Sequence, residues 1–329
     1  MIVWMSRSKA PKRVIVVTAK PWGLEGDAIN GVIDYMNIAA HLRLVGSGGN
    51  PFIAPQEVDE AEFDGAIGFF NIRKRLDSIT RRGVPAVNLS SRFAESPMPR
   101  VCADDQAIGR LGAEHLMERG FAQFAFVGWS GMWFGEQRLA GFRSVIEDAG
   151  RPCHVYGERL HDEDGDLSKL RHWIKKLPKP IAVMAANDHL GKYVIDGAAE
   201  MGLVIPDDVA VIGVDNNHWA MAAAAAPMSS IEPDGRLIGY RAAEMLDGML
   251  AGGQPLPDQF IPPLRVVTRR STEISLADDP LVSAALRVIR DRCQEGIEVE
   301  DVLDDLAVSR STLERRMKAA IGLTPRVAI

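Results

Sequence analysis

Along the first 270 residues, short uniformly apolar runs alternate with longer segments whose apolar positions recur at helical spacing. Uniformly apolar runs are typical of strands buried on both faces of a parallel sheet, and their alternation with amphipathic helices is typical of an α/β fold. Two successive runs of similar size meet near residues 101–104, so we predict two lobes. The expected strands are 13–18, 63–70, 84–89, 124–128, 153–156, 181–185, 209–214 and 264–270, and the expected helices are 28–44, 73–82, 106–119, 135–149, 167–177, 189–201 and 233–251.

The pattern changes after residue 270. A polar segment, 271–279, is expected to link the α/β part to residues 280–329, which carry only helical periodicity. Apolar spacing predicts helices at 281–292, 297–307 and 312–320, with a turn at Val308 and an N-cap at Ser309 or Ser311. Two short helices joined by a tight turn match the helix-turn-helix plan.

Composition narrows the class of protein. A chain of 329 residues that is 47% hydrophobic and 25% charged is an ordinary globular mixture, long enough for two or three domains. The net charge of −6 argues against a surface that grips nucleic acid everywhere, but permits one basic module. Three distant cysteines argue against a disulfide framework or a zinc site. Residues 1–13 lack the apolar region of a signal peptide and no stretch is apolar enough to span a membrane, so we expect a cytoplasmic protein.

The first candidate for a site is the stretch 209–219. An apolar strand there ends in Asp215, Asn216, Asn217, His218 and Trp219. Ligands of open α/β sheets bind beyond the carboxyl ends of the strands. An indole face offers an apolar platform, while carboxylates and amides orient a polar ligand such as a sugar. The alternative is an ordinary helix N-cap, for which Asp and Asn are preferred residues.

Tryptophan placement supports a binding cleft. Four of the six tryptophans follow predicted strand ends: Trp22, Trp129, Trp133 and Trp219. Each alone is explained more simply by packing, but four on one edge of the sheets favour a cleft in which a ligand stacks on aromatic rings. Glu25, Glu136 and Asn217 are further candidates, with solvated loop positions as the alternative. His189 and His218 lie near the same edge, where a lone histidine is more often a hydrogen-bonding wall than a base.

Motifs of common enzyme classes are missing from the sequence. It contains no GxxxxGK[ST] phosphate loop, no GxGxxG before a helix, no HExxH and no GxSxG. We therefore predict no catalytic residue, no metal and no cofactor.

Several motifs in the first part, in the correct order, resemble the sensor core of lactose-repressor-type regulators and sugar-binding proteins. They are 101–116, Glu136-Gln137-Arg138-Leu139-Ala140-Gly141-Phe142, Ala186-Asn187-Asp188, 205–216 and 227–231. The resemblance spans about 12–270 and implies a type I periplasmic-binding-protein core, an α/β fold of two lobes that are each built on a doubly wound parallel sheet. In such a core, lobe 1 would hold about 12–102 and 233–262, and lobe 2 about 103–232 and 263–270. Three crossovers would join the lobes, and a small ligand would lie in the cleft.

The same resemblance implies three sugar contacts. Arg138 stands at the arginine before Gly-Phe, Asp188 at the acid of the Asn-Asp pair, and Asp215 at the acid after the Gly-Val strand. The chemistry agrees, because a guanidinium offers a planar fork of donors and carboxylates accept hydroxyl hydrogens through charge-assisted bonds.

The last part resembles the DNA-binding domain of AraC-type activators in the segments 308–318 and 321–325. That domain has two helix-turn-helix units, and residues 280–329 match only the first, so we expect a partial module. Between Ser309 and Arg326 the sequence has five basic residues and one acidic residue, which is typical of a phosphate-seeking surface. The resemblance places the segment from Ser309 to Lys318 along the groove-facing helix. The expected contacts to bases or phosphates are Arg310, Ser311, Thr312, Arg315, Arg316 and Lys318.

A sugar-binding core placed before an AraC-type module resembles regulators of pentose catabolism. We therefore expect a homodimeric transcription activator that binds operator DNA and responds to a monosaccharide, with D-xylose as the first candidate. The alternatives are a stand-alone sugar-binding receptor that does not bind DNA, and an α/β enzyme that uses Asp188 and Asp215 as an acid–base pair.

Overall fold

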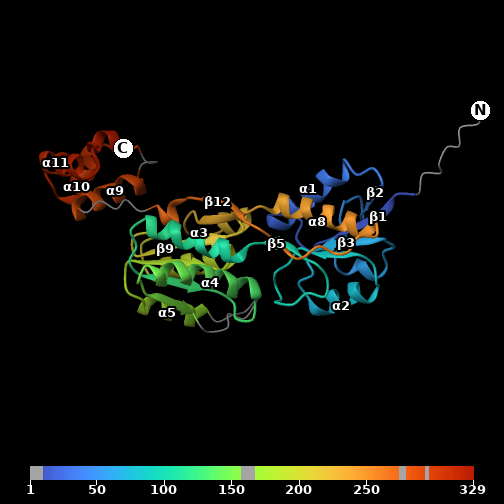
Figure 1. Cartoon of the computed structure of the whole chain (residues 1–329). Coiled ribbons are helices and arrows are strands. Elements are labelled where there is room, and N and C mark those ends of the chain that lie inside the picture. The colour runs from blue at the N-terminus through green and yellow to red at the C-terminus, as the bar shows by residue number, and fades with distance from the viewer. Residues whose placement is uncertain (1–9, 157–166, 274–278, 293–295) are drawn as a thin grey trace, which may run out of the picture. The chain divides into compact units, whose positions relative to one another are not determined.

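The computed structural model describes residues 10–156, 167–273, 279–292 and 296–329, and Figure 1 shows the chain. Residues 1–9 of the basic amino end and residues 274–278 of the expected linker lie outside the described residues. Contacts divide the chain into two compact units, 1–272 and 273–329. The first unit has the two-lobed α/β architecture that the apolar pattern predicted, and its fold is the one that the resemblance implied.

The amino-terminal lobe of the first unit is built on a parallel four-stranded sheet in the order β2-β1-β3-β4. Its central strands are buried on both faces because helices cover both sides: α1 and α8 lie together on one face and α2 on the other (Figure 1). A separate parallel pair, β5 with β11, continues the lobe. The elements are β1 (Lys12–Val17), α1 (Leu24–Met36), β2 (Leu42–Val45), η1 (Glu57–Asp59), β3 (Gly65–Gly68), α2 (Arg73–Arg81), β4 (Ala86–Asn88), β5 (Val101–Ala103), α8 (Gly235–Leu250) and β11 (Gln259–Ile261).

The second lobe holds a six-stranded sheet in the order β12-β10-β9-β8-β6-β7. Every neighbouring pair is parallel except β10 with β12, which is antiparallel. The elements are α3 (Asp105–Glu118), β6 (Phe124–Val127), α4 (Trp133–Asp148), β7 (Cys153–Tyr156), α5 (Leu167–Lys176), β8 (Ile181–Ala185), α6 (Asp188–Glu200), β9 (Val209–Val214), α7 (His218–Ala222), β10 (Ser229–Pro233), β12 (Pro263–Val267) and η2 (Arg270–Thr272).

Glycines set the close packing of α3 against α4. A Cβ at Gly109 would lie 2.1 Å from the carbonyl oxygen of Arg138, and one at Gly141 would lie 2.1 Å from that of Gln106. Neither position has room for any side chain, so the backbones of the two helices are in direct contact. The glycine after Arg138-Leu139-Ala140 therefore fixes the helix that carries Arg138.

Two predictions of local structure were wrong. The helix expected over 28–44 ends at Met36, and Leu42–Val45 instead forms β2, paired with β1 from Lys12↔Leu42 onward. Sheet pairing overrides the helical spacing of the apolar residues there. The expected linker also starts too early, because Ser271 and Thr272 are fully buried in the first unit as part of η2.

The second unit contains only helices among its described residues, as the periodicity predicted. These are α9 (Pro280–Arg292), α10 (Val299–Leu306), α11 (Arg310–Ile321) and α12 (Pro325–Ala328). Ala307 turns the chain with φ 51°, and the hydroxyl of Ser309 caps α11 by accepting from the N–H of Thr312, so Ser309 and not Ser311 is the N-cap. The buried core is Val282, Ala285, Ile289, Ile297, Val302, Leu313 and Met317.

Candidate functional site

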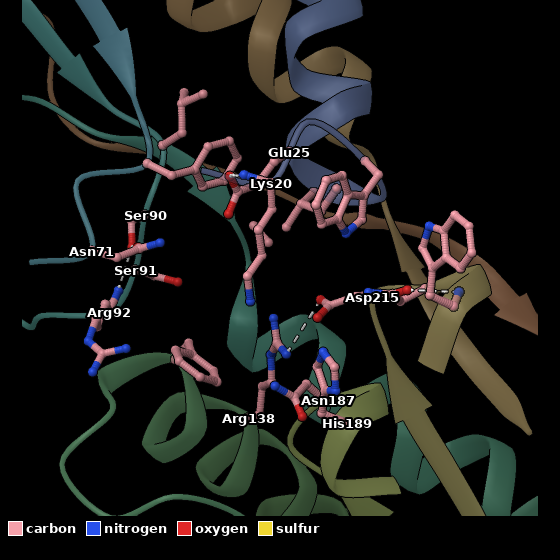
Figure 2. Close-up of a pocket in the computed structure, with 18 residues that line it drawn as sticks. Lys20, Glu25, Asn71, Ser90, Ser91, Arg92, Arg138, Asn187, His189 and Asp215 are labelled. Atoms are coloured by element: carbon pink, nitrogen blue, oxygen red, sulfur yellow. Dashed lines mark hydrogen bonds and ion pairs between the residues drawn. The ribbon is translucent and has the colours of Figure 1, made fainter. Parts of the chain in front are cut away.

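A cavity of about 570 Å³ lies between the two lobes of the first unit. Loops that follow the carboxyl ends of strands in both sheets form its wall, as expected for an α/β fold. The amino-terminal lobe supplies Lys20, Trp22, Asn71 and Ser90 to Arg92, and the second lobe supplies Phe134, Arg138, Asn187, His189, Asp215, Asn217 and Trp219. Figure 2 shows Lys20 extending toward Arg138 and Asp215, with Asn71 and the Ser90–Arg92 segment on the opposite wall.

Six of the ten residues expected to bind sugar line this cavity. They are Trp22, Glu25, Arg138, Asp215, Asn217 and Trp219. Aromatic faces, a guanidinium, carboxylates and amides therefore meet in one space of the size that small-molecule sites usually have.

Arg138 is buried and bound on several sides. Its Nε donates to Asp105 Oδ1 at 2.8 Å, its Nη1 donates to the carbonyl of Ala186 at 2.5 Å, and its guanidinium lies 5.1 Å from the ring centre of Phe134. Asp105 is itself held by a 2.6 Å bond from the Ser91 hydroxyl of the other lobe. Arg138 is thus fixed before a ligand arrives, which lowers the entropy cost of binding.

Asp215 lies next to Arg138 in the wall that the second lobe contributes. Its Oδ1 lies 3.9 Å from Nη1 of Arg138, and its side chain is 29% exposed. The backbone has φ 102° at Asp215 and φ 48° at Asn216, conformations that non-glycine residues seldom adopt. Burial raises the pKa of Asp215 to about 6, with the carboxylates of Asp105 and Glu25 adding to the rise and Arg138 and Lys20 opposing it. A carboxylate in this position can accept two hydroxyl hydrogens from a polyol.

Glu25, at the start of α1, lines the cavity from the amino-terminal lobe. Its carboxylate accepts hydrogen bonds from the Thr18 hydroxyl and, at 3.3 Å, from the N–H of Lys20. Burial raises the pKa of Glu25, and these two hydrogen bonds partly offset the rise. The carboxylate is therefore shared between the loop after β1 and the cavity.

Asp188 does not reach the cavity, contrary to the expectation from the resemblance. It is 1% exposed, and its two oxygens accept from the N–H of Asn217 at 2.6 Å and the hydroxyl of Ser230 at 2.7 Å. Gly213 packs against it so closely that a Cβ there would lie 2.1 Å from Asp188 Oδ1. Asp188 therefore supports the loop that carries Asp215 from behind.

Trp129, Trp133 and Glu136 are also outside the lining. Trp133 packs against Phe260 at 6.0 Å and under the guanidinium of Arg100 at 4.7 Å, while Trp129 packs edge-on against Phe134 at 6.4 Å. Glu136 is exposed on α4. The first turn of α4 runs along the wall, and Phe134 is the residue there that lines the cavity. Of the four expected stacking rings, Trp22 and Trp219 remain, 48% and 70% exposed.

Sequence reasoning missed the polar residues of the amino-terminal lobe. Lys20, Asn71 and the Ser90–Arg92 segment each lie a few residues beyond β1, β3 and β4. The rule that singled out Asp215, a polar residue beyond a strand end, applies equally to them. They were overlooked because no aromatic or acidic cluster marked those loops.

The lobes also touch directly beside the cavity. The N–H groups of Trp133 and Phe134, at the start of α4, donate to the carbonyls of Arg92 and Ser91, each at 3.0 Å. The first N–H groups of a helix have no partner within it, so this loop satisfies two of them. These bonds tie the α4 end of the second lobe to the loop after β4.

In the second unit, some of the six expected DNA contacts are bound to other residues of the unit and others are exposed. Arg316 donates to both oxygens of Asp279, and Arg310 is paired with Glu300 and, at 3.9 Å, with Glu314. The Thr312 hydroxyl lies 2.8 Å from that of the capping Ser309. Ser311, Arg315 and Lys318 are exposed on α11.

Known proteins share the architecture of this chain. A family model described as a periplasmic binding protein-like domain matches residues 113–272. The solved structure of a xylose-binding transcription activator superposes with a TM-score of 0.78 at 25% identity, covering 97% of this chain and 85% of that one. A LacI family regulator of Enterococcus faecalis, solved with bound ribose, gives a TM-score of 0.61 at 20% identity, covering 79% of this chain and 98% of that one, and supports the fold alone.

Fold and pocket together define a two-lobed, periplasmic-binding-protein-like sensor core. Among curated proteins, the xylose operon regulatory protein of Escherichia coli K12 is 30% identical over 272 residues, 79% of this chain and 69% of the relative. That of Haemophilus influenzae is 29% identical over 279 residues, 81% and 72% respectively. The chain belongs to the family of the xylose operon regulatory proteins, which are sugar-responsive transcription regulators. None of the helices in the described ranges has the length and apolar character needed to cross a membrane.

Proposed function

We propose that this chain is a cytoplasmic transcription activator whose effector is a pentose, with D-xylose as the first candidate. The observation that carries the proposal is the cavity itself, where a donor fork, a carboxylate and two indole rings surround a space open to a small polyol. Arg138 would donate to sugar oxygens, Asp215 would accept from sugar hydroxyls, and Trp22 and Trp219 would cover the apolar faces of the ring.

Closure of the lobes is the proposed response to sugar. Both lobes line the cavity, so a bound sugar makes its full set of hydrogen bonds only when they are closed. The difference in affinity between the closed and open arrangements is what would shift the equilibrium. The Ser91–Asp105 and α4–loop bonds would be retained in that closed form.

The second unit would bind operator DNA as one module of a homodimer. Its capped α10–turn–α11 arrangement and the exposed Arg315 and Lys318 support this role. Further support comes from the solved xylose-binding activator, whose match to 97% of this chain extends into the second unit. Arg310 and Arg316, which are held by carboxylates of their own unit, would contribute less than Arg315 and Lys318.

A thermal-shift panel of pentoses and hexoses tests the proposed effector. At a hundred times its dissociation constant a ligand stabilises the folded state by about 2.7 kcal/mol, so the preferred pentose should raise the melting temperature by several degrees. The sugar should be recovered unaltered. Consumption of the sugar would instead point to an enzyme, and the absence of any shift across the panel would contradict the sensor role.

A further inference from the structure

The loop that presents Asp215 is tied to the carboxyl end of the first unit by one side chain. Arg269 Nη2 donates to Asn216 Oδ1 at 2.8 Å. Asn216 is held at two further atoms: its Nδ2 donates to Glu232 at 3.1 Å and its N–H donates to the Ser230 hydroxyl at 3.0 Å. The bond from Arg269 therefore joins a residue beside the sugar pocket to one 53 positions further along the chain.

Arg269 is itself locked at both its backbone and its side chain. Its N–H donates to the Ser229 hydroxyl at 2.8 Å, and its carbonyl accepts from the same hydroxyl at 2.9 Å. Nη1 donates to the carbonyl of Met228 at 3.0 Å and lies 3.1 Å from the sulfur of Met221 in α7. Movement of the Asp215 loop or of α7 would therefore act on the same guanidinium.

The residues that follow Arg269 are the last of the first unit, and they are anchored as firmly. Ser271 and Thr272 are fully buried. The Ser271 hydroxyl donates to the carbonyl of Val211 at 2.6 Å, within β9, the strand that leads to Asp215. The Thr272 hydroxyl lies 2.9 Å from His115 Nε2 and 2.7 Å from the hydroxyl of Ser229.

The backbone conformation of the Asp215–Asn216 loop depends on the contacts that hold it. Asp215 and Asn216 both have positive φ, at 102° and 48°. Non-glycine residues remain in such conformations only where their surroundings hold them. The contacts that hold Asn216 are the hydroxyl of Ser230, the carboxylate of Glu232 and the guanidinium of Arg269, and the last of these is also the contact that leads to Ser271 and Thr272.

We propose that Arg269 is a positioning residue that holds the Asp215–Asn217 loop in its binding geometry and transmits pocket occupancy to Ser271 and Thr272, where the first unit ends. The transmission part rests on the proposed sugar-sensing function; the positioning part stands on the hydrogen bonds alone. A bound sugar would tighten the loop, and through Asn216 and Arg269 it would tighten the segment from which the second unit continues.

Hydrogen exchange of the full chain tests the positioning part without any ligand. Arg269→Gln should speed exchange of the Asn216 and Asn217 N–H groups by about tenfold, because a hydrogen bond from a charged donor is lost. Asn216→Gly, which tolerates the positive φ while removing the amide, should speed exchange of the Ser271 and Thr272 N–H groups by a similar factor. Arg241→Gln removes an exposed ion pair with Glu244 on α8 and is the matched control, with neither segment changed.

Repeating the exchange with saturating D-xylose tests the transmission. In the parent chain, sugar should protect both the Asn217 and the Ser271–Thr272 N–H groups. In Arg269→Gln, protection should return at Asn217 but not at Ser271 and Thr272. Equal protection of both segments in the variant would overturn the proposal, as would a uniform rise in exchange over the first unit, which would indicate general destabilisation. The more conservative Arg269→Lys serves if Arg269→Gln does not fold.

The ligand-free and ligand-bound results separate two failures. If D-xylose leaves exchange in the parent unchanged, the proposed effector is wrong. The ligand-free exchange of Arg269→Gln and Asn216→Gly still decides whether Arg269 positions the loop. Suppose instead that D-xylose protects the pocket, but Arg269→Gln leaves exchange at Asn216 and Asn217 unchanged and Asn216→Gly leaves exchange at Ser271 and Thr272 unchanged. The effector then stands, and the role of Arg269 is refuted.

Discussion

The inter-lobe pocket of the first unit and helix α11 of the second unit use charged side chains in opposite ways. Around the pocket, Arg138 and Asp188 are buried and held by partners far apart in sequence, Arg138 by Asp105 and Asp188 by Ser230. On α11, charges are at the surface and their partners, where they have them, belong to the same small unit. Removing one charge should therefore change the first unit strongly and the second only mildly.

Each region also contains an expected ligand contact whose charged group is instead bound within the fold. Asp188 accepts two hydrogen bonds behind the pocket wall, and Arg316 is bound to Asp279. Asp215, in the loop that Asp188 supports, and Arg315, next to Arg316 on α11, are the ones left open to a ligand. Residue type identifies a functional segment, but the partners of each side chain decide which member of the segment can bind.

The largest expected difference between the two regions is in acid sensitivity. Burial lowers the pKa of His115 to about 3, from 6.5 in the unfolded chain. As pH falls below 6.5, His115 takes up a proton in the unfolded chain before it does so in the folded chain. The stability that the neutral, buried His115 allows is therefore present above pH 6.5 and is lost as pH falls. Between pH 6.5 and 4 the loss from His115 should be about 3 kcal/mol.

Comparing the parent with His115→Gln in urea unfolding across this range measures the effect. The variant should lose less stability on acidification, and the difference should be confined to the transition of the first unit. Identical pH profiles would mean that His115 is protonated readily in the folded state. A profile that changed in the second unit would contradict the separation of the two regions.

A second test concerns the stability cost of the binding site. The folded-state pKa of Asp215, about 6, exceeds its ordinary value of 3.8, so its burial costs stability as pH rises through this range. Two pKa units correspond to nearly 3 kcal/mol, which we reduce to about 2 kcal/mol because the carboxylate is partly hydrated. Asp215→Asn should therefore be more stable than the parent at pH 8 and similar to it near pH 4. Equal stability at both pH values would show that the site carries no such cost.

The smallest expected effect is on α11. Arg315→Ala should weaken binding of a DNA fragment selected with the full chain by about tenfold and reduce the salt dependence of binding. Arg316→Ala, one position away, should leave DNA affinity nearly unchanged and instead lower the melting temperature of the second unit slightly, because it loses the Asp279 pair. Gel-shift titrations at two salt concentrations and calorimetry would compare the two variants. Equal losses of DNA affinity would remove the distinction that the structure draws between them.

Much of this architecture could be predicted from the sequence because its signals are local. Uniformly apolar strands such as β9, and the two helices beside the capping Ser309, have patterns that need no knowledge of the rest of the chain. The edge of the sheets where the pocket lies followed from the same pattern, since polar residues after parallel strands gather there.

What could not be predicted depends on tertiary contacts. Leu42–Val45 continues a helical pattern and becomes a strand only by pairing with β1. Trp133 and Phe134 are adjacent, yet Phe134 faces the pocket and Trp133 packs on Phe260, because α4 begins at this point. The burial of Ser271 and Thr272 follows from bonds to Val211 and His115, which no spacing in the sequence reveals.

Titration of intrinsic tryptophan fluorescence with D-xylose and other pentoses is the most direct test of the inter-lobe pocket as the sugar site. Trp22 and Trp219 line the cavity, so one pentose should give a saturable change in the parent chain. Asp215→Asn should weaken that sugar by about a hundredfold, because it replaces charge-assisted hydrogen bonds to two hydroxyls. A saturable response of unchanged affinity in Asp215→Asn, or none with any pentose in the parent, would contradict the assignment.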